Sequence, residues 1–430
     1  MQNKNDEGIV LGKEMSNFNR ILGFIAIITV YFFYCYNFMV GTFVKPTMVA
    51  TMDKGGFGFT FKQTEAIFAV MSFATIIGTF IFGTIASKIG KKKTLIAIAI
   101  SIAVTTYLPL VVPTSFTLWR IGRFATGLAL GGVFGTAMPL AAEMFPQKYR
   151  GKLAAILTSL FSLAMIFGGK LYGALGDANW RILMYTCIIP EFVAAILVFF
   201  FVPDDSEYTK KLNIEAQDKG EKINYFNMYK GKYLWIGLGA ILLSGANFVA
   251  YSSFSNNSTT YLRNVLGFSA ATAGAIYSIQ GIGQLIGYNM WGFIADKFGR
   301  KIPAVGMLAC AIFVFIFTRL GSQDVSTFKA VSFLLGLFVG YSGHWGAYYT
   351  ELFPKKFSAL APGISFNGGR IISTFALPAI AGLADTSVGM LGIFNISLSV
   401  FIAGTVVWAF LPETLSTKVF VKTAEETLNS

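Results

Sequence analysis

The sequence predicts an all-α membrane protein with twelve transmembrane helices in two six-helix halves. Hydrophobic residues make up 54% of the chain and charged residues only 13%, about half the charged share of a soluble domain. One loop pattern occurs twice, in Gly83–Lys93 and Gly292–Lys301, at an offset of 209 residues (292 − 83). A second pair, beginning at Glu143 and Glu351, follows at 208 residues (351 − 143). These features predict a duplicated bundle of membrane helices.

Twelve apolar segments follow one another along the chain, and each crossing of a bilayer takes ~20 residues. They lie at 20–44, 64–87, 94–112, 117–142, 153–175, 181–202, 232–255, 269–295, 303–320, 328–351, 358–383 and 388–411. A long polar stretch of mixed charge separates the sixth segment from the seventh. The predicted order is a cytoplasmic tail (1–18), an N-terminal six-helix domain (19–202), a cytoplasmic linker (203–231), a C-terminal six-helix domain (232–411) and a cytoplasmic tail (412–430).

The distribution of the basic residues predicts the topology. The chain carries a formal charge of +13, and most of its lysines and arginines fall between segments on one side. The outer loops hold few, among them Lys45, Lys54 and Lys62. This positive-inside bias predicts an inner-membrane protein with both termini in the cytoplasm. The bias also accounts for the positive net charge, so the charge does not indicate a nucleic-acid partner. Residues 1–18 are polar and predict a tail, not a signal peptide.

The two copied loops carry the most specific sequence signal. They resemble the Gly-x-x-x-Asp-(Arg/Lys)-x-Gly-(Arg/Lys) signature of the major facilitator superfamily. Asp296 fills the acidic position in the second copy, whereas Ser87 stands there in the first. The resemblance implies two six-helix domains around a central cavity, with solutes moved by alternating access.

In this family the copied loops form cytoplasmic charge latches that favour the outward-facing state. A glycine that opens each pattern lets helices approach closely, and a second glycine makes the tight exit turn. Acids at the inner ends of helices 4 and 10 complete the latches. The resemblance assigns state switching to Gly83, Gly90, Lys91, Glu143, Arg150, Gly292, Asp296, Gly299, Arg300, Glu351 and Lys356.

Other motifs resemble the branch that contains sugar porters and organic-acid:proton symporters. Arg123 with its following glycines matches helix 4 of that branch, and Trp180-Arg181 matches the start of helix 6. The stretch from Pro362 to Ile371 resembles aromatic-acid and sialic-acid symporters. Those acid symporters carry Asp-Gly-Phe-Asp in helix 1. Here Tyr34 to Asn37 occupy these positions, so both acids are absent.

Arg370 is the first candidate for substrate binding. It lies roughly 16 Å from the inner start of its segment, near the membrane midplane. A charge there costs about 3 kcal/mol or more, so it should face a cavity and have a partner. That partner is a substrate carboxylate, or else a structural group on another helix. Arg123 is open to the same two interpretations.

Further candidates line the same region. Trp345 and Tyr348 are three apart on one helical face and could stack on a planar substrate. His344 and Glu191 are candidates for proton coupling, with a packing role as the alternative for each. The polar lining is completed by Tyr34, Asn37, Asn247, Tyr251, Gln280 and Gln284.

The sequence therefore predicts a secondary transporter that imports a small organic anion, a carboxylate, with coupling to protons. The alternative is a sugar or polyol carrier, either coupled to an ion or uncoupled. Asn247 and Tyr251 resemble a sugar-porter motif, but Ile241 and Leu242 stand where such porters have paired glutamines. No nucleophile–base or metal constellation predicts an enzyme. We expect a monomer with a small-molecule substrate, membrane lipid and protons as partners, and no cofactor, metal or nucleic acid.

Overall fold

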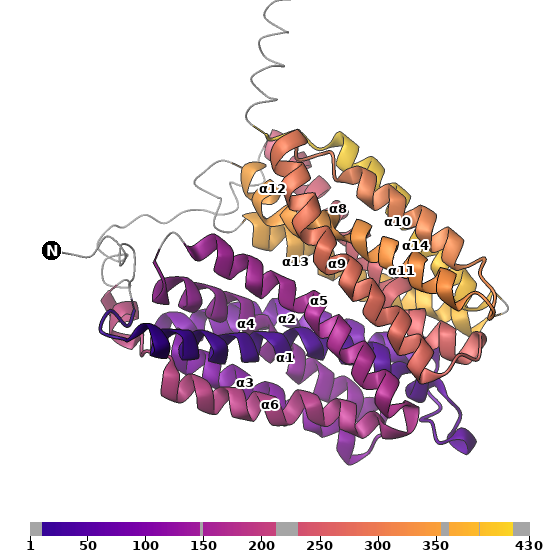
Figure 1. The fold of residues 1–430 in the computed structure, drawn as a ribbon, viewed down its shortest axis with the longest axis horizontal. Helices are drawn as coiled ribbons and strands as arrows, with labels where there is room; N and C mark the ends of the chain where they lie inside the picture. The colour runs from indigo at the N-terminus through magenta and orange to yellow at the C-terminus, as the bar shows by residue number, and fades with distance from the viewer. Residues whose placement is uncertain (1–10, 147–148, 212–230, 354–360, 387, 416–430) are drawn as a thin grey trace, which may run out of the picture. The chain divides into compact units, whose positions relative to one another are not determined.

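The computed structural model describes residues 11–146, 149–211, 231–353, 361–386 and 388–415. The chain divides into two compact units, residues 1–59 with 63–222 and residues 60–62 with 223–430. Within the described residues, thirteen α-helices and five short helical turns follow in order and no strand occurs, which confirms the predicted fold class (Figure 1). The predicted tails and linker lie largely outside these residues.

The first unit contains six long helices. Side-chain hydroxyls cap two of them, because Ser16 accepts from the N–H of Asn19 and Ser115 from that of Leu118. Helix α6 packs along both α1 and α3. The elements are α1 (Asn17–Val49), η1 (Met52–Lys54), α2 (Phe61–Ile89), α3 (Lys91–Val111), α4 (Phe116–Met144), α5 (Arg150–Leu175), η3 (Asp177–Asn179) and α6 (Trp180–Phe201).

The second unit repeats this pattern with two interruptions. Helix α8 continues into a π-helical turn, η5, and the tenth crossing is divided in three. The elements are α8 (Lys232–Thr260), η5 (Tyr261–Val265), α9 (Ala270–Phe298), α10 (Ala304–Phe317), α11 (Val325–Val339), η6 (Gly340–His344), α12 (Trp345–Glu351), α13 (Ala361–Ala381), η8 (Gly382–Asp385) and α14 (Gly389–Phe410).

The predicted single helix over 328–351 is broken by the 3₁₀ segment η6. Gly340 and Gly343 lie in this segment and pack against α9. A Cβ at Gly340 would lie 2.2 Å from the carbonyl carbon of Gly287, and one at Gly343 would lie 2.9 Å from the Tyr288 ring. The tenth crossing therefore changes its helical geometry where it meets α9 most closely.

Glycines allow α2 to pack on α4 and α9 on α11 at backbone distance. Added Cβ atoms would lie 1.9 Å from the Leu128 carbonyl oxygen at Gly78 and 2.2 Å from that of Leu337 at Gly287. The close approach expected at Gly83 and Gly292 is wrong, because a Cβ at either would meet nothing within 4 Å in the described chain. The expected tight turns are confirmed by a φ of 93° at Gly90 and 127° at Gly299.

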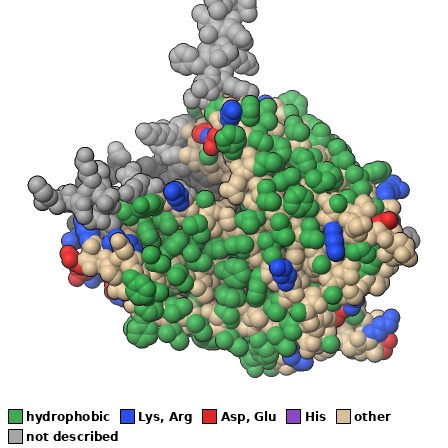
Figure 2. Space-filling view, viewed as in Figure 1, with side chains coloured by type: hydrophobic (Ala, Val, Ile, Leu, Met, Phe, Trp, Pro, Cys, Tyr) green, Lys and Arg blue, Asp and Glu red, His purple; other side chains and the backbone are tan. Residues whose placement is uncertain are grey.

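Apolar side chains cover much of the molecular surface. In the space-filling view, green hydrophobic groups dominate the visible face and charged groups are few (Figure 2). Nine helices of the described part are long and apolar enough to cross a membrane, and α10 is a shorter apolar helix. This surface suits lipid and not water, so the chain is an integral membrane protein.

Candidate functional site

A buried polar cluster surrounds Arg123 on α4. Its Nη1 donates to Oδ1 of Asn37 on α1 at 3.4 Å, and the Thr106 hydroxyl of α3 donates to the same oxygen at 3.3 Å. Nη2 lies 3.4 Å from the sulfur of Met184, and the Phe68 ring centre lies 5.7 Å from the guanidinium carbon. In the described part of the chain, no carboxylate pairs with Arg123. The structure thus brings together two predicted residues, Arg123 and Asn37, with neutral groups around the charge.

Tyr34 and Glu191 are buried in the same unit but outside this cluster. Tyr34 packs its ring against Tyr31, Phe38 and Phe161. Glu191 on α6 is wholly buried, and neither carboxyl oxygen has a hydrogen-bond partner among the described residues. It follows Met184 by seven residues, which is two turns or about 10.5 Å along the helix. Arg123 and Glu191 are therefore both oriented into the interior of the first unit.

A buried ion pair joins α1 to α2. Lys45 Nζ lies 2.5 Å from Glu65 Oε1, and the two side chains are only 1% and 3% exposed. The ammonium also lies 5.6 Å from the centre of the Phe68 ring, which Arg123 contacts as well. The assignment of Lys45 to an outer loop is wrong, because α1 continues through Pro46 to Val49. Sequence analysis missed this pair because it placed Lys45 in the loop after the first segment, 20–44, whereas Glu65 lies in the second, 64–87.

Arg370 lies on α13, where it contacts α8. Its guanidinium carbon is 5.3 Å from the centre of the Phe248 ring and 5.9 Å from that of Phe366. Gly369 brings the two helices together, because a Cβ there would lie 2.5 Å from the backbone nitrogen of Gly245. Arg370 is half-buried. The result is a cation beside two aromatic rings that pack edge to face on each other, with their centres 4.9 Å apart.

The predicted amides of the second unit are bound to nearby hydroxyls. Tyr341 donates to Oδ1 of Asn247 at 2.7 Å. Gln280 Nε2 donates to Ser255 Oγ at 2.7 Å, and Gln284 Nε2 donates to Tyr288 Oη at 2.6 Å. Tyr251 contacts the same Ser255. The predicted residues Asn247, Tyr251, Gln280 and Gln284 therefore belong to hydrogen-bonded chains inside the unit, which reduces the number of donors that a sugar could use.

His344, Trp345 and Tyr348 form a packed aromatic cluster around Trp408 of α14. The His344 ring stacks on Trp408 at 5.6 Å, and Trp345 meets Trp408 edge-on at 5.5 Å and is 2% exposed. Tyr348 donates its hydroxyl to the carbonyl of Pro412 at 2.9 Å. The interpretation of Trp345 and Tyr348 as a stacking platform for a substrate is not supported, because both rings are covered by their own unit.

The first latch joins α3, α4 and the end of α6. Lys91 Nζ lies 2.9 Å from Glu143 Oε2 and 3.4 Å from Asp205 Oδ2. The backbone N–H groups of Lys91 and Lys92 donate to the two Asp205 oxygens at 2.7 and 2.9 Å. Asp205 therefore caps the start of α3, where the helix dipole favours a carboxylate. Ser87 donates its hydroxyl to the carbonyl of Thr84 in its own helix.

The second latch has the same plan with an arginine at its centre. Arg300 donates to both carboxyl oxygens of Glu351, at 3.0 and 2.8 Å, and pairs with Asp296. The backbone N–H groups of Arg300 and Lys301 donate to the two Glu413 oxygens at 2.8 and 3.1 Å. The imidazole Nε2 of His344 lies 3.1 Å from the Arg300 carbonyl oxygen. This arrangement connects the latch to the aromatic cluster.

The electrostatics of the second latch favour its charged form. Hydrogen bonding to Glu351, with a contribution from Asp296, raises the pKa of Arg300. Burial alone would raise the pKa of Glu413, but N–H groups of Leu415, Arg300 and their neighbours lower it overall. Both groups are therefore charged at neutral pH.

Sequence analysis missed Asp205 and Glu413 as latch residues. The signal was present, since both follow a proline in the repeated closing motifs Pro203-Asp-Asp and Pro412-Glu, and they lie 208 residues apart (413 − 205). The side chain of Arg150 and all of Lys356 lie outside the described residues. In the part of the chain that is described, no three His, Cys, Asp or Glu side chains gather as a metal site.

Comparisons with known proteins agree with this architecture. A family model described as Major Facilitator Superfamily matches residues 23–364 and 243–428. The cis,cis-muconate transport protein of Acinetobacter baylyi is 29% identical over 311 residues, which cover 70% of this chain and 73% of that protein. A sialic acid transporter of Escherichia coli, NanX, is 24% identical over 352 residues, covering 81% and 83%. The crystal structure of a D-xylose-proton symporter matches with a TM-score of 0.70 at 18% identity over 93% of this chain and 99% of that one, a likeness of fold.

Proposed function

Because this chain belongs to the Major Facilitator Superfamily, we propose that it imports a small organic anion, a carboxylate, by alternating access. It is a membrane transport protein for small molecules and not an enzyme. We place it in the inner membrane with both termini in the cytoplasm, since the lysines and arginines concentrate in the loops on that side.

The observation that carries the proposal is Arg370. The Arg370 guanidinium lies beside the Phe248 and Phe366 rings on a half-buried side chain. Its planar donor fork matches the geometry of a carboxylate. The two rings would pack on a planar or apolar part of the same substrate. The substrates for which two relatives are named, muconate and sialic acid, are also carboxylic acids.

We propose further that Glu191 carries the coupled proton. The helix 1 position that faces Arg123 is the amide of Asn37, which does not titrate near neutral pH and so cannot carry the coupled proton as a carboxyl group would. Glu191 is the buried acid nearest in sequence to the Arg123 contact at Met184, and a buried carboxyl without partners is stable only when protonated. His344 is a weaker candidate, because its Nε2 is engaged with the backbone of Arg300.

Substrate-induced current in proteoliposomes tests the substrate class. The panel contains cis,cis-muconate, an aromatic acid, sialic acid and hexoses. Labelled substrate is followed beside the current, because a monocarboxylate that enters with one proton carries no net charge. We expect an acid to enter the vesicles, and Arg370→Gln to lower its apparent affinity about tenfold or more, as the loss of a charged hydrogen bond implies. Arg319→Gln is the matched control, since Arg319 is an exposed arginine over the Phe315 ring. Unchanged affinity in Arg370→Gln contradicts the carboxylate site.

The same vesicles decide between an anion and a sugar. The sugar or polyol alternative rests on the amide side chains of Asn247, Gln280 and Gln284, which would have to exchange their present hydroxyl partners for those of the substrate. No entry of any labelled acid, together with entry of a labelled hexose, would identify a sugar carrier and leave Arg370 with a structural role.

Glu191→Gln tests the proton site. We expect this variant to keep substrate exchange between equal concentrations and to lose accumulation driven by a pH gradient. Glu207→Gln, a change at an exposed acid of the same unit, should keep both activities. Accumulation at the wild-type level in Glu191→Gln would remove Glu191 from the mechanism.

A further inference from the structure

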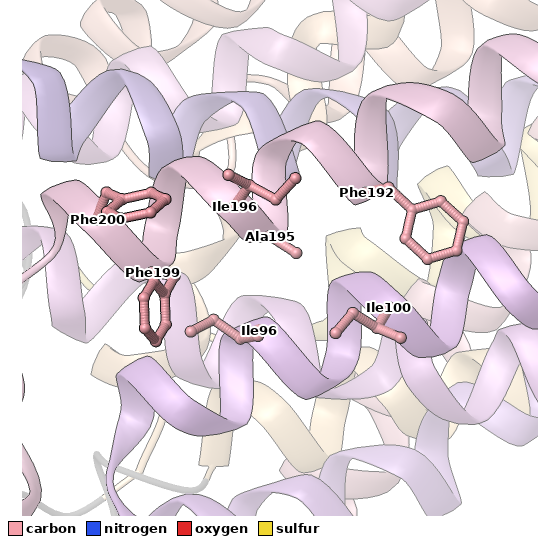
Figure 3. Close-up of a pocket in the computed structure, with 7 residues that line it drawn as sticks. All are labelled: Ile96, Ile100, Phe192, Ala195, Ile196, Phe199 and Phe200. Carbon is pink, nitrogen blue, oxygen red and sulfur yellow. The ribbon is translucent and has the colours of Figure 1, made fainter.

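An apolar groove lies between α3 and α6 on the first unit. It has a volume of about 240 Å³ and is lined only by hydrophobic side chains. Ile96 and Ile100 of α3 face Phe192, Ile196 and Phe199 of α6 across it (Figure 3). Along α6 the lining residues extend from Phe192 to Phe200, eight steps of the helix or about 12 Å.

The groove faces outward from the unit. Ile196 is 56% exposed and Phe199 60% exposed, although both lie on a helix that crosses the membrane. In a bilayer, side chains exposed at this level contact acyl chains and not water. The groove is therefore shaped and placed to hold part of a lipid chain.

A lysine stands at one end of the groove. Lys92 precedes Ile96 by one turn of α3, about 6 Å along its axis, and its ammonium lies 5.6 Å from the Phe199 ring centre. Among the described residues, no carboxylate lies within ion-pair distance of this ammonium. The neighbouring Asp205 is already bound by the N–H groups of Lys91 and Lys92 and by the Lys91 ammonium.

The adjacent charges add to this basic end. Lys93 is exposed and pairs with Asp204 only at 3.6 Å. Lys88, at the end of α2, is also exposed. The positive-inside rule places this end at the cytoplasmic surface, where anionic headgroups attract lysines.

We propose that this groove binds an anionic phospholipid, with one acyl chain between α3 and α6 and the phosphate beside Lys92. The apolar lining alone would accept any phospholipid chain. The lysine adds the preference for negative charge, because the headgroup of a zwitterionic lipid carries its own cation. Neither Arg370 nor Glu191 lines the groove: Glu191 precedes the exposed Phe192 on α6 but is itself buried.

Native mass spectrometry of the full-length protein in detergent tests the proposal. The probes are phosphatidylglycerol and phosphatidylcholine with the same acyl chains. We expect the first to bind more tightly, by about fivefold, which is the effect of one lysine near an anionic headgroup. Lys92→Gln should abolish this preference, and Lys92→Arg should keep it. Ile196→Trp fills the groove and should weaken the binding of both lipids.

Two control variants keep the test specific. Lys297→Gln removes a lysine that also lies near phenylalanine rings, at the end of α9 in the other unit. Ile312→Trp enlarges an exposed isoleucine of α10. Neither should change binding. Equal binding of the two lipids to the wild type, or an equal loss in Lys297→Gln and Lys92→Gln, overturns the proposal.

Discussion

Arg123 shows how this chain keeps a charged residue inside a membrane domain. The guanidinium has an amide oxygen, a methionine sulfur and aromatic ring faces around it, and no acid in the described chain. These neighbours are neutral and polarizable, so they stabilise the charge without fixing it as a carboxylate would. The cation is therefore available to respond to a change of charge nearby, such as deprotonation of Glu191.

Lys45, unlike Arg123, is neutralised by a carboxylate, that of Glu65. We predict that breaking this ion pair lowers the free energy of unfolding. Glu65→Gln leaves the Lys45 ammonium buried without its counter-charge and should destabilise the protein by about 3 kcal/mol. Thermal unfolding in detergent measures the loss. The double variant Lys45→Met with Glu65→Leu removes both charges and should recover most of the stability. A double variant as unstable as Glu65→Gln would contradict this account.

At the scale of elements, the 3₁₀ segment η6 changes the direction in which Trp345 and Tyr348 point, compared with one continuous helix over 328–351. A 3₁₀ helix advances about 120° per residue and an α-helix about 100°, so five residues of η6 rotate the following turn by about 100°. Trp345 and Tyr348 lie directly after it and point toward Trp408 of their own unit. The sequence offered only glycines at 340 and 343 as a sign of this break.

Glycine packing between α9 and α11 gives a prediction with a control on the same helix. Gly287→Ala places a Cβ 2.2 Å from the Leu337 carbonyl oxygen and should cost about 1–3 kcal/mol. Gly292→Ala meets nothing within 4 Å and should be neutral, or stabilising by up to about 1 kcal/mol. Thermal unfolding of the two variants checks this, and equal loss in both would refute it.

The Glu413 carboxylate, which binds the backbone of the turn before α10, gives a pH-dependent prediction. The pKa of Glu413 is lowered by the fold, so its stabilising effect is complete above its ordinary value of 4.5 and disappears as the pH falls through the lowered value. Glu413→Gln should cost about 1–2 kcal/mol at pH 7, as loss of a charged helix cap does.

Melting temperatures across a pH series test this dependence. The difference between wild type and Glu413→Gln should be constant near neutrality and shrink below about pH 4.5. Glu207→Gln, which changes an exposed acid, should give no such trend. A difference that persists unchanged to pH 3 would show that the Glu413 charge is not responsible.

For the whole molecule, the repeat at 208 to 209 residues relates the two units position by position. Lys91 and Arg300, Glu143 and Glu351, and Asp205 and Glu413 occupy equivalent places in their latches. The latches share no residue. We predict that Glu143→Gln and Glu351→Gln each cost about 1 kcal/mol, and that these costs add in the double variant.

Transport should not follow that additivity, because in the alternating-access cycle that we propose both latches form and break in every turnover. After one latch has been weakened, weakening the second should change the initial uptake rate by a different factor. Thermal unfolding and uptake on the same three variants check the two statements. Additive effects on both would mean that the latches act independently of the transport cycle.

The sequence was sufficient for what repetition and hydropathy encode. Hydropathy and the repeated motifs predict twelve crossings, two halves and the tight turns at Gly90 and Gly299. Contacts between distant side chains are not encoded in this way. Lys45 with Glu65, and Arg370 with Phe248, meet only because particular helix faces turn toward each other. The substrate roles of the predicted site residues therefore stay predictions, whereas the fold is confirmed.

The paired latches also give the chain a record of its own duplication. The first copy combines a lysine with a short capping acid, Asp205, and the second an arginine with a longer one, Glu413. Each copy is therefore a natural precedent for changes in the other. Lys91→Arg with Asp205→Glu would transplant the second combination into the first half, whereas either change alone mixes the two. The duplicated halves therefore hold two different pairs of residues at equivalent positions, and each pair can be exchanged for the other as a matched set.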